Sequence, residues 1–324
     1  MLPTESGFAI HRYRLQAHHA LNARHPAASV EGVLLHHAGG FACLQPWPSL
    51  GDAPLTEHLK AILENRPTGL SARVWECLTL DAAARAAQQS LFDGLDIPAS
   101  HATLVGGWDA STLLAARAAG FSAVKIKAGP DWRKLVQEVQ SALDAWPELR
   151  LRVDFNGTLS ADGLCAFAQA LSPAAHAAVD FIEDPCPFEA NHWHALEQST
   201  GLRLAADRAC ADAAAEDFIG VVKPSVEDAP ALLARAVHSG RKMVVTSNMD
   251  HPLGILWAAY HAGLYARAGV LHGLCGLCTQ LVFEPDAFSA RLPVVDGRFF
   301  PPGGTGLGFD GMLAALPWEI LREG

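Results

Sequence analysis

Several features that mark membrane and secreted proteins are missing from this chain of 324 residues. No apolar run approaches the roughly 20 residues that a membrane-spanning helix needs. The first residues, MLPTESGFAIHRYRLQ, lack the basic region and following apolar segment of a secretory signal. We therefore expect a cytoplasmic protein that makes no contact with a membrane.

Positive charge is scarce as well. The chain has 24 Lys and Arg residues against 34 Asp and Glu residues, which gives a formal net charge of −10, and its basic residues form no block. A nucleic-acid surface needs a basic stripe to displace counterions, so we expect no nucleic-acid partner. A few cations in one pocket can still bind a small anion inside an acidic protein. The sequence leaves the oligomeric state open.

Disulfide and zinc motifs are also absent. The seven cysteines are an odd number spread over a long chain, which fits reduced thiols better than a disulfide framework. Cys275 and Cys278 have the C-x-x-C spacing, but a structural zinc site would need a second such pair or a histidine pair. We interpret both as packing residues. The run GGTGLG (303–308) follows no strong strand and opens no long helix, so we interpret it as a turn and not as a phosphate-binding loop.

What the sequence does contain is a regular alternation of short β-rich runs with Ala- and Leu-rich segments of helical periodicity. Eight such runs begin at His101, Ala123, Leu149, Ala178, Leu202, Gly220, Lys242 and Val270. Between them, Asp109, Asp131 and Ser160 stand at expected helix N-caps and Gly120 at an expected helix end. The pattern predicts the α/β class and a TIM-type barrel modified as (β/α)7β, with an open doubly wound sheet as the alternative.

The first hundred residues show a different pattern of predicted strands and helices. The strand-like runs FAIHRYRLQ, VEGVLLHH and FACLQ, with a turn at Gly39 and Gly40, predict an antiparallel meander. Two helical stretches, LTEHLKAIL and SARVWECLTLDAAARAAQQSLF, follow it. We therefore predict an α+β capping domain over residues 1–98 and a catalytic barrel over residues 99–298. The tail, residues 299–324, is expected to pack back on the capping domain.

Charged residues stand at the ends of five successive predicted strands. In strand order they are Lys125 and Lys127, then Arg152, Asp154 and Asn156, then Glu183 and Asp184, then Asp207, and then Lys223. Alternate residues of a strand share a face, and the catalytic groups of such a barrel lie at the carboxyl ends of its strands. A single strand-end Asp or Glu is more often a helix cap or part of a surface ion pair. Its recurrence on successive strands favours a functional site over a non-catalytic binding or scaffold barrel.

Three carboxylates, Asp154, Glu183 and Asp207, would converge in this arrangement. Anions so close together repel one another unless a divalent cation lies between them. Oxygen ligands favour a hard ion, so we expect Mg²⁺, with Mn²⁺ as the alternative, to hold a carboxylate substrate. Lys127 and Lys223 stand on either side of these carboxylates in strand order, which suits two amine groups on opposite faces of the substrate. A lysine acts as a general base when nearby cations lower its pKa toward neutrality.

This set of residues resembles the enolase superfamily, in particular its muconate-cycloisomerase-like branch with a K-x-K motif and a second lysine. Members of that superfamily use a lysine or histidine base together with Mg²⁺. The resemblance implies that Asp154, Glu183 and Asp207 are metal ligands. It also implies that Lys127 is the catalytic base, Lys125 its partner and Lys223 the lysine on the opposite face.

Within that branch, the chain is most similar to the o-succinylbenzoate synthase family, through LQPWP (44–48), R-x-D-x-N at strand three and K-P-S at strand six. The resemblance implies syn dehydration of 2-succinyl-6-hydroxy-2,4-cyclohexadiene-1-carboxylate to o-succinylbenzoate, a step of menaquinone biosynthesis. Lys127 would remove the α-proton and assist the departure of the hydroxyl, while protonated Lys223 would stabilise the enediolate. The residues implied to orient the site or to line the succinyl pocket are Arg152, Asn156, Ser247, Asn248, Gly273 and Leu274.

The chain departs from the family pattern at two places. The family commonly has Asp-Glu where this chain has Asp207 and Arg208, and the interval from Asp207 to Lys223 is short. Asp184 would replace Glu183 in the pocket if the strand register shifted by one residue. A dipeptide or N-acylamino-acid epimerase, or a cycloisomerase, of the same superfamily is the alternative function. Such epimerases tend to carry Asp-x-Asp at strand eight, where this chain has HGLCGL, and a His251–Asp dyad would need an Asp in place of Lys223.

Overall fold

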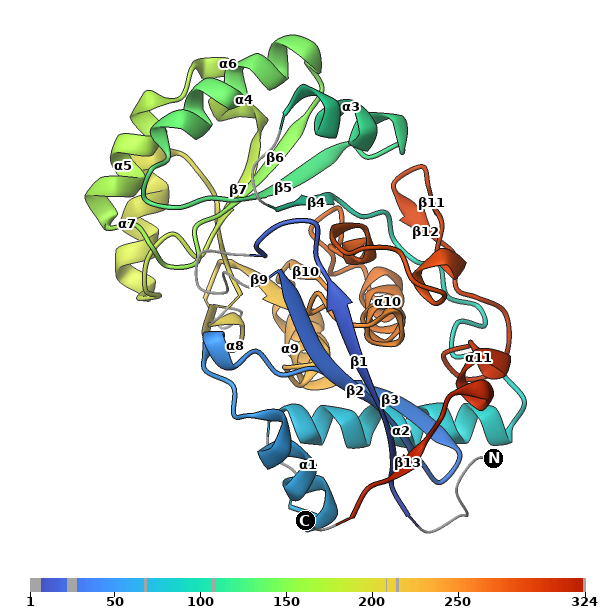
Figure 1. Ribbon diagram of the computed structural model, residues 1–324. Coiled ribbons are helices and arrows are strands. Elements are labelled where there is room, and N and C mark those ends of the chain that lie inside the picture. Colours follow the sequence, from blue (N-terminus) through green and yellow to red (C-terminus); the bar gives the residue numbers. More distant parts are fainter. Residues whose placement is uncertain are drawn as a thin grey trace.

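The structure, a computed structural model, describes six stretches of the chain: residues 7–21, 28–66, 69–105, 109–207, 209–213 and 216–322. An antiparallel sheet with flanking helices lies beside a curled sheet of parallel strands that is surrounded by helices (Figure 1). Arg208 lies outside the described residues, so its effect on Asp207 stays a question raised by the sequence.

The N-terminal part is the antiparallel meander that the alternating pattern predicted. Its sheet has the order β13-β1-β2-β3, and Gly39 takes a positive φ of 84° in the turn between β2 and β3. The tail contributes β13, which pairs with Ala9 and Ile10 of β1. The elements of this part are β1 (Ala9–Gln16), β2 (Ser29–His37), β3 (Gly40–Leu44), the 3-10 turn η1 (Pro48–Leu50), α1 (Leu55–Leu63), α2 (Leu70–Ala86) and β13 (Glu319–Ile320).

Helix α2 ends earlier than the sequence predicts, and the Gly-rich run explains why. The helical pattern continued to Phe92, whereas the helix ends at Ala86. Leu91 N donates to Gly306 O (2.8 Å) and Gly306 N donates to Gln89 O (2.8 Å), so the chain after the helix is extended and paired. Asp81 on α2 accepts from Leu307 N (2.6 Å). The run 303–308 is thus a turn that fastens the tail to α2, as its sequence context indicated.

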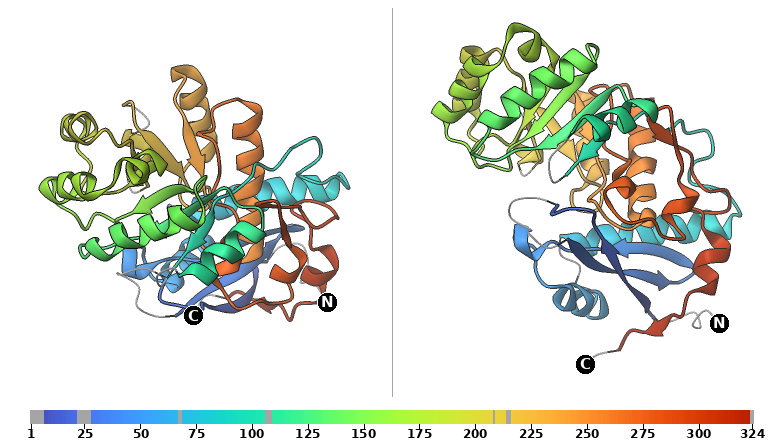
Figure 2. Two further views of the ribbon diagram at one scale, coloured as in Figure 1. Left: turned by 90° about the horizontal axis from the view of Figure 1, so that it is seen from above. Right: turned by 45° about the horizontal axis from the view of Figure 1, so that its top comes forward.

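The barrel is built from parallel strands in sequence order, each followed by helical structure. Its strands are β4 (Ala102–Leu104), β5 (Ala123–Lys127), β6 (Arg150–Asp154), β7 (Val179–Glu183), β8 (Leu204–Ala206), β9 (Ile219–Val222) and β10 (Met243–Val245). Its helices are α3 (Ala110–Ala118), α4 (Arg133–Ala145), α5 (Ala161–Ala170), α6 (Pro173–Ala178), α7 (Ala190–Thr200), α8 (Cys210–Ala213), α9 (Ala229–Ser239) and α10 (Pro252–Arg267). Figure 2 shows these helices outside the curled sheet.

The eighth β-rich run closes the barrel without forming a regular strand. Thr246 at the end of β10 bridges to Gly276, and Cys275 bridges to Ser100 just before β4. The segment therefore lies between the first and last strands of the parallel sheet and joins its two edges. This arrangement confirms the predicted (β/α)7β barrel and rules out the open sheet, which would leave β4 and β10 unconnected.

Local capping signals placed most helix starts correctly. Asp109 accepts from Thr112 N (2.8 Å) and Ser160 accepts from Gly163 N (3.1 Å), so both side chains satisfy free amide groups of a first turn. Gly120 has a positive φ of 79° after α3, as predicted. Asp131 is not a cap, because α4 starts at Arg133 and the residue at its N-cap is Trp132.

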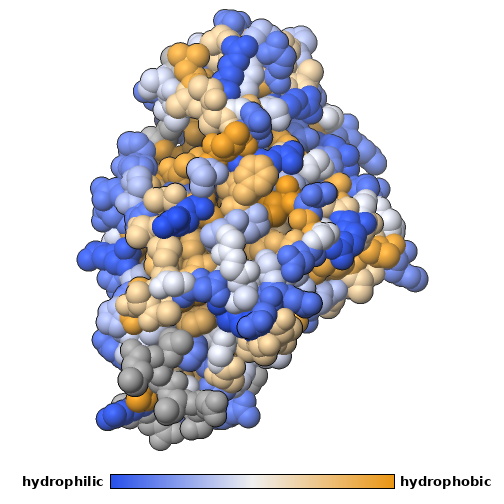
Figure 3. Space-filling model, turned by 90° about the vertical axis from the view of Figure 1, so that its right-hand side faces the viewer, coloured by the Kyte–Doolittle hydropathy of each residue, from blue (hydrophilic) through white to orange (hydrophobic). Residues whose placement is uncertain are grey.

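The largest of three apolar clusters among the described residues joins the two parts. Buried side chains of the N-terminal sheet and α2, such as Leu34 and Leu78, belong to the same cluster as Val153 and Leu256 of the barrel. After α10 the chain forms η2 (Thr279–Val282), η3 (Ser289–Arg291), β11 (Val294–Val295), β12 (Arg298–Phe299) and α11 (Asp310–Ala315). One face of the molecule carries hydrophobic side chains across its middle, bordered by hydrophilic ones (Figure 3). Among the described helices, none is long and apolar enough to cross a membrane.

A buried carboxyl group, that of Asp250, lies between β10 and α10. Its Oδ2 accepts from Ser225 Oγ (3.0 Å), whereas Oδ1 has no hydrogen-bond partner within the described stretches. Gly254 is packed so closely that a Cβ there would lie 2.3 Å from Asp250 Oδ2. Burial raises the pKa of Asp250 to about 7.

This raised pKa predicts a pH-dependent cost of keeping Asp250 buried. Between about pH 4 and pH 7 the folded protein retains the proton and the unfolded chain has lost it, so rising pH lowers the free energy of unfolding by up to roughly 1.4 kcal/mol per pH unit. We expect Asp250→Asn, which keeps an acceptor for Ser225, to gain stability relative to the wild type as pH rises from 4 to 7. Urea unfolding at several pH values measures this.

The exposed Asp96 offers a matched control, since Asp96→Asn removes one charge at the surface. An Asp250→Asn variant whose stability follows the same pH curve as the wild type would contradict the assigned burial cost.

Candidate active site

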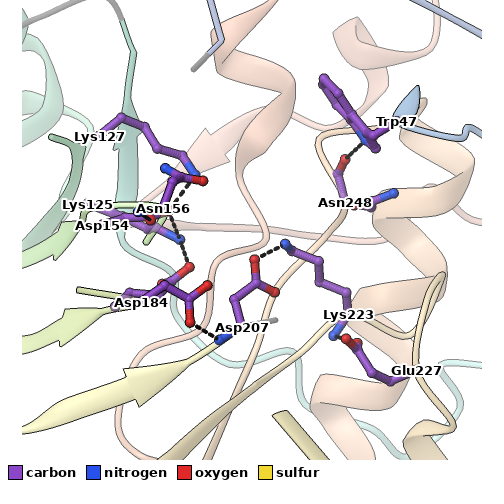
Figure 4. Close-up of polar contacts among 11 residues, drawn as sticks. Trp47, Lys125, Lys127, Asp154, Asn156, Asp184, Asp207, Lys223, Glu227 and Asn248 are labelled. Atoms are coloured by element: carbon purple, nitrogen blue, oxygen red, sulfur yellow. Dashed lines mark hydrogen bonds and ion pairs between the residues drawn. The ribbon is translucent and has the colours of Figure 1, made fainter. Parts of the chain in front are cut away.

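The charged residues predicted at the strand ends lie along one edge of the parallel sheet. Lys127 ends β5, Asp154 ends β6 and Glu183 ends β7, and the register pairs Lys127 with Asp154 and Asp154 with Glu183. Asp207 follows β8 and Lys223 follows β9 directly. Because parallel strands in register bring their carboxyl ends together, residues far apart in the sequence meet here (Figure 4).

Each of the three carboxylates faces a lysine. Lys125 Nζ lies 2.5 Å from Glu183 Oε1 and 3.2 Å from Asp154 Oδ2. Lys127 also pairs with Asp154, which is therefore shared between two lysines. Lys223 pairs with Asp207 on the other side of the group, so the two lysines Lys127 and Lys223 lie on opposite sides of the carboxylates (Figure 4).

A fourth carboxylate, Asp184, adjoins this set. Its Oδ1 accepts from the backbone N–H of Asp207 (3.2 Å), and its φ of 41° is unusual for a residue with a side chain. The predicted register holds, since Glu183 pairs with Lys125 and Asp184 lies toward Asp207. The edge thus gathers four carboxylates against three lysines.

Burial sets the protonation of these groups. Asp154 and Glu183 are each 1 % exposed. Burial raises the pKa of Glu183 to about 7, with Lys125 opposing the rise and Asp154 adding to it. Burial and the charge of Asp207 raise the pKa of Asp184 to about 7. For Asp154, burial would raise the pKa, but Lys127 and Lys125 outweigh it and hold the pKa well below its usual range.

The same charges favour the ammonium form of two lysines. Burial alone would lower the pKa of Lys125, but Glu183 and Asp154 outweigh it and raise that pKa. Burial acts on Lys223 in the same sense, and Asp207 reverses it, so the pKa of Lys223 is also raised. The ion pair with Asp207 therefore favours the ammonium form of Lys223.

The donor chemistry of this edge fits a hard divalent cation. Four carboxylates on three neighbouring strand ends supply only oxygen, the ligand type that Mg²⁺ prefers. Burial, with neighbouring carboxylates adding to it, raises the pKa of Glu183 and of Asp184 to about 7, so a divalent cation beside them would favour their charged forms. Across the described stretches, however, no three His, Cys, Asp or Glu side chains converge at metal-binding distances. Lysines face the carboxylates instead, so the assignment of Asp154, Glu183 and Asp207 as ligands stays a prediction.

A cavity of about 320 Å³ opens beside these charges, between the barrel and the N-terminal part. Lys125, Lys127, Asn156, Asp207 and Lys223 line it, whereas Asp154 and Glu183 lie behind its surface. Asn156 takes a positive φ of 51° and its backbone N donates to Asp154 Oδ1 (3.0 Å), which fixes the turn after β6. A small molecule in this cavity would meet lysines from two sides.

The predicted residues of strand seven also reach the cavity. Ser247 and Asn248 line it, and the Ser247 hydroxyl lies 2.6 Å from that of Thr279. Trp47, from the N-terminal part, lies beside Asn248 in the lining, and its Nε1 donates to Asn248 O (3.1 Å; Figure 4). Both parts of the chain thus form the wall.

Three other predicted residues lie outside the lining of this cavity. Arg152 is 1 % exposed and donates to Asp180 Oδ2 (2.9 Å), His101 Nδ1 (2.8 Å) and Leu274 O (2.8 Å). It therefore ties β6 to the segment that closes the barrel. Gly273 and Leu274 belong to that segment, and the geometry gives no support to substrate contact by Arg152, Gly273 or Leu274.

Several residues that line the cavity had not been singled out as site residues. They are Trp47, Leu50, Asp52, His101, Thr103, Val226, Glu227, Thr246, Met249, Gly276 and Thr279. Strand alternation could have found His101 and Thr103, because they are two residues apart on the first barrel strand. Trp47 lies in the LQPWP segment, but nothing local in the sequence indicates that this segment reaches strand seven.

Gln45 holds the two walls of the cavity together. Its Oε1 accepts from Tyr13 OH (3.1 Å) and its Nε2 donates to Met249 O (2.9 Å). Met249 has a positive φ of 52°, so this contact fixes an uncommon backbone turn next to Asn248. At 3 % exposure, Gln45 is effectively removed from solvent.

Lysines and carboxylates at the carboxyl ends of the strands of a capped (β/α)7β barrel are the arrangement expected of a barrel enzyme's active site. The family model described as "O-succinylbenzoate synthase, N-terminal domain" matches residues 8–84. The model described as "Enolase C-terminal domain-like" matches residues 109–312. The chain belongs to the enolase superfamily and, within it, to the proteins that resemble o-succinylbenzoate synthase.

A relative of similar length supports this assignment. An o-succinylbenzoate synthase from Bdellovibrio bacteriovorus is 30 % identical, with 96 % of this chain and 97 % of that protein covered.

Solved structures share the fold at lower identity. The L-Ala-D/L-Glu epimerase from Bacillus subtilis superposes with a TM-score of 0.78 at 17 % identity, covering 94 % of this chain and 98 % of that one. A mandelate racemase/muconate-lactonizing enzyme type of protein from Roseovarius nubinhibens, solved with magnesium, gives 0.71 at 19 % identity, covering 97 % and 95 %.

The hydrogen bonds of Gln45 predict how much stability is lost when the N-terminal part is no longer joined to the turn after β10. Gln45→Leu would leave Met249 O without its donor from Gln45 and Tyr13 OH with Cys43 Sγ as its remaining side-chain partner among the described residues, so we expect the free energy of unfolding to fall by about 1–3 kcal/mol. Urea denaturation measures the change, and Gln89→Leu at an exposed position is the control. Equal stability of the two variants would show that Gln45 does not hold this junction.

Proposed function

We propose that this protein is an o-succinylbenzoate synthase, which dehydrates 2-succinyl-6-hydroxy-2,4-cyclohexadiene-1-carboxylate to o-succinylbenzoate in menaquinone biosynthesis. The observation that carries the proposal is the pair Lys127 and Lys223, which line one cavity from opposite sides of buried carboxylates. Similarity to the Bdellovibrio synthase along 96 % of the chain supports the choice of reaction. The partner is a small carboxylate, not a nucleic acid or a membrane.

Lys127 is the proposed base. Its amine takes the proton from the carbon that bears the carboxylate, and the hydroxyl on the neighbouring carbon then leaves with a proton returned by the same lysine. One C–H and one C–O bond break, water is released, and the ring gains its third double bond. A single base on one face suits this syn elimination. Asp154 is shared by Lys127 and Lys125, so Lys125 can keep that carboxylate paired when Lys127 turns to the substrate.

Lys223 is the proposed electrostatic stabiliser. It lines the cavity on the side opposite Lys127, and as an ammonium group it would face the enediolate without exchanging a proton. Asn156, Ser247 and Asn248 are proposed to orient the substrate from the cavity wall.

The proposal includes Mg²⁺, or Mn²⁺, at Asp154, Glu183 and Asp207. Such an ion supplies positive charge for the substrate carboxylate and for the negative charge that develops on it. Of these three carboxylates, Asp154 is held by a backbone amide, because its Oδ1 accepts from Asn156 N (3.0 Å). This contact would keep its carboxylate in place when Lys127 moves.

An epimerase of the same superfamily is the second candidate, favoured by the shared fold with the Bacillus subtilis epimerase. Epimerisation needs a proton donor and a proton acceptor on opposite faces, and Lys127 and Lys223 are placed for that too. The segment that closes the barrel, residues 271–276, offers no carboxylate for a substrate ammonium group, which argues against this candidate.

Turnover distinguishes the two reactions. Purified protein with Mg²⁺ and the cyclohexadiene substrate is expected to form o-succinylbenzoate, which chromatography detects. Epimerisation of dipeptides or N-acylamino acids without any o-succinylbenzoate would reject the proposed dehydration.

The role of Lys127 predicts the effect of removing its amine. Lys127→Ala is expected to lower kcat by roughly 10²–10⁴-fold or more, because no base reaches the α-proton. Lys134→Ala on α4, where the side chain is 80 % exposed, is the matched control. Activity retained in Lys127→Ala at the level of the control would reject the assignment.

The carboxylates predict metal affinity that can be measured without substrate. Calorimetric titration with Mg²⁺ should give binding to the wild type and a loss of at least about ten-fold in Asp154→Asn, because a ligand oxygen loses its charge. Asp162→Asn, at an exposed position of α5, should bind as the wild type does. Full turnover in the presence of a chelator would contradict the metal-assisted scheme.

A further inference from the structure

The deepest part of the cavity holds a histidine that the proposed reaction does not use. His101 directly precedes β4, is 2 % exposed and lines the cavity. Thr103, two residues further, lines it too, so both side chains leave the same face of the strand. The register pairs Thr103 with Lys125, which puts His101 one layer deeper than Lys125.

The tautomer of His101 follows from its partner. Arg152 Nη1 lies 2.8 Å from His101 Nδ1, and a guanidinium group can only donate. Nδ1 must therefore accept, which leaves the proton of a neutral imidazole on Nε2. Burial and the positive charges of Arg152 and Lys125 lower the pKa of His101 well below its usual value, so the ring is neutral.

The Nε2–H group of His101 adjoins the cavity wall. A Cβ on Gly276 would lie 2.9 Å from His101 Cε1, 3.0 Å from Nε2 and 2.8 Å from Thr246 Cγ2. All three residues line the cavity, so the absence of a side chain at Gly276 leaves this edge of the imidazole open. Arg152 is the one hydrogen-bond partner of the His101 side chain among the described residues, so no described protein group accepts from Nε2–H.

We propose that His101 is a substrate-binding residue that donates its Nε2–H to an oxygen of the succinyl group. This inference rests on the proposed function. The closing segment joins His101 to β10, through Ser100 with Cys275 and Gly276 with Thr246. The carboxylates stand across the ring on β6, β7 and after β8. An oxygen that reaches His101 therefore belongs to the end of the substrate away from the reacting carboxylate.

Two substitutions separate this role from that of a partner for Arg152. His101→Asn keeps an acceptor at the place of Nδ1 and removes the donor, whereas His101→Gln keeps a donor at the place of Nε2 and loses that acceptor. We expect His101→Asn to melt near the wild-type Tm but to bind o-succinylbenzoate about ten-fold more weakly. His101→Gln is expected to melt lower and to retain most of the affinity.

Calorimetric titration of each protein with o-succinylbenzoate in the presence of Mg²⁺ measures the affinities, and benzoate, which lacks the succinyl group, is the control ligand. Benzoate affinity should be unchanged in His101→Asn. If His101→Asn binds o-succinylbenzoate as tightly as the wild type does, and the wild type turns over its substrate, the role of His101 is overturned but the proposed function is not. A loss in His101→Gln without a loss in His101→Asn would show a purely structural role. A wild type that neither forms nor binds o-succinylbenzoate would overturn the proposed function and this inference with it.

Discussion

The balance of buried charge at the carboxyl edge of the barrel is the constraint on which the rest of the site depends. Asp154 and Glu183 are almost fully buried, and an ion taken from water without a partner costs several kcal/mol. Lysines on the neighbouring strands reduce that cost. Because each pair joins different strands, the charges also fix how the strand ends lie against one another. Glu183 and Asp184 keep a pKa raised to about 7 in spite of these lysines, so further positive charge at the site would favour their charged forms.

A second constraint comes from the shared cavity. One wall belongs to the N-terminal part and the other to the barrel, so the shape of the cavity depends on how the two parts are joined. Trp47 and Gln45 each donate to a backbone carbonyl of the turn after β10, at Asn248 and Met249. These hydrogen bonds satisfy buried carbonyl groups and orient the turn at the same time. Substitutions in the N-terminal part are therefore expected to change the shape of the cavity without touching the lysines.

The sequence predicted the barrel and its strand-end charges because both depend on local periodicity and on a rule about parallel strands. Lys127, Asp154 and Lys223 follow from that rule alone. The sequence could not predict that the closing segment forms isolated β-bridges and no regular strand. Those bridges depend on pairing with Ser100 and Thr246, which lie far away in the sequence. The same limit applies to Arg152, which fits the family motif and was predicted to orient the site. In the structure its guanidinium donates to Leu274 O and so ties β6 to the closing segment. Long-range packing decided the outcome in both cases.

The two lysines are not equivalent, and their surroundings explain why. Among the described lysines, Lys223 alone forms an ion pair with Asp207, and this pair raises the pKa of Lys223. Lys127 shares Asp154 with Lys125, so Asp154 remains paired when Lys127 moves toward a substrate. A symmetric two-base epimerase would need both amines to alternate between charged and neutral forms. The proposed elimination on one face would need one mobile base and one fixed cation, and the different pairing of Lys127 and Lys223 fits that proposal.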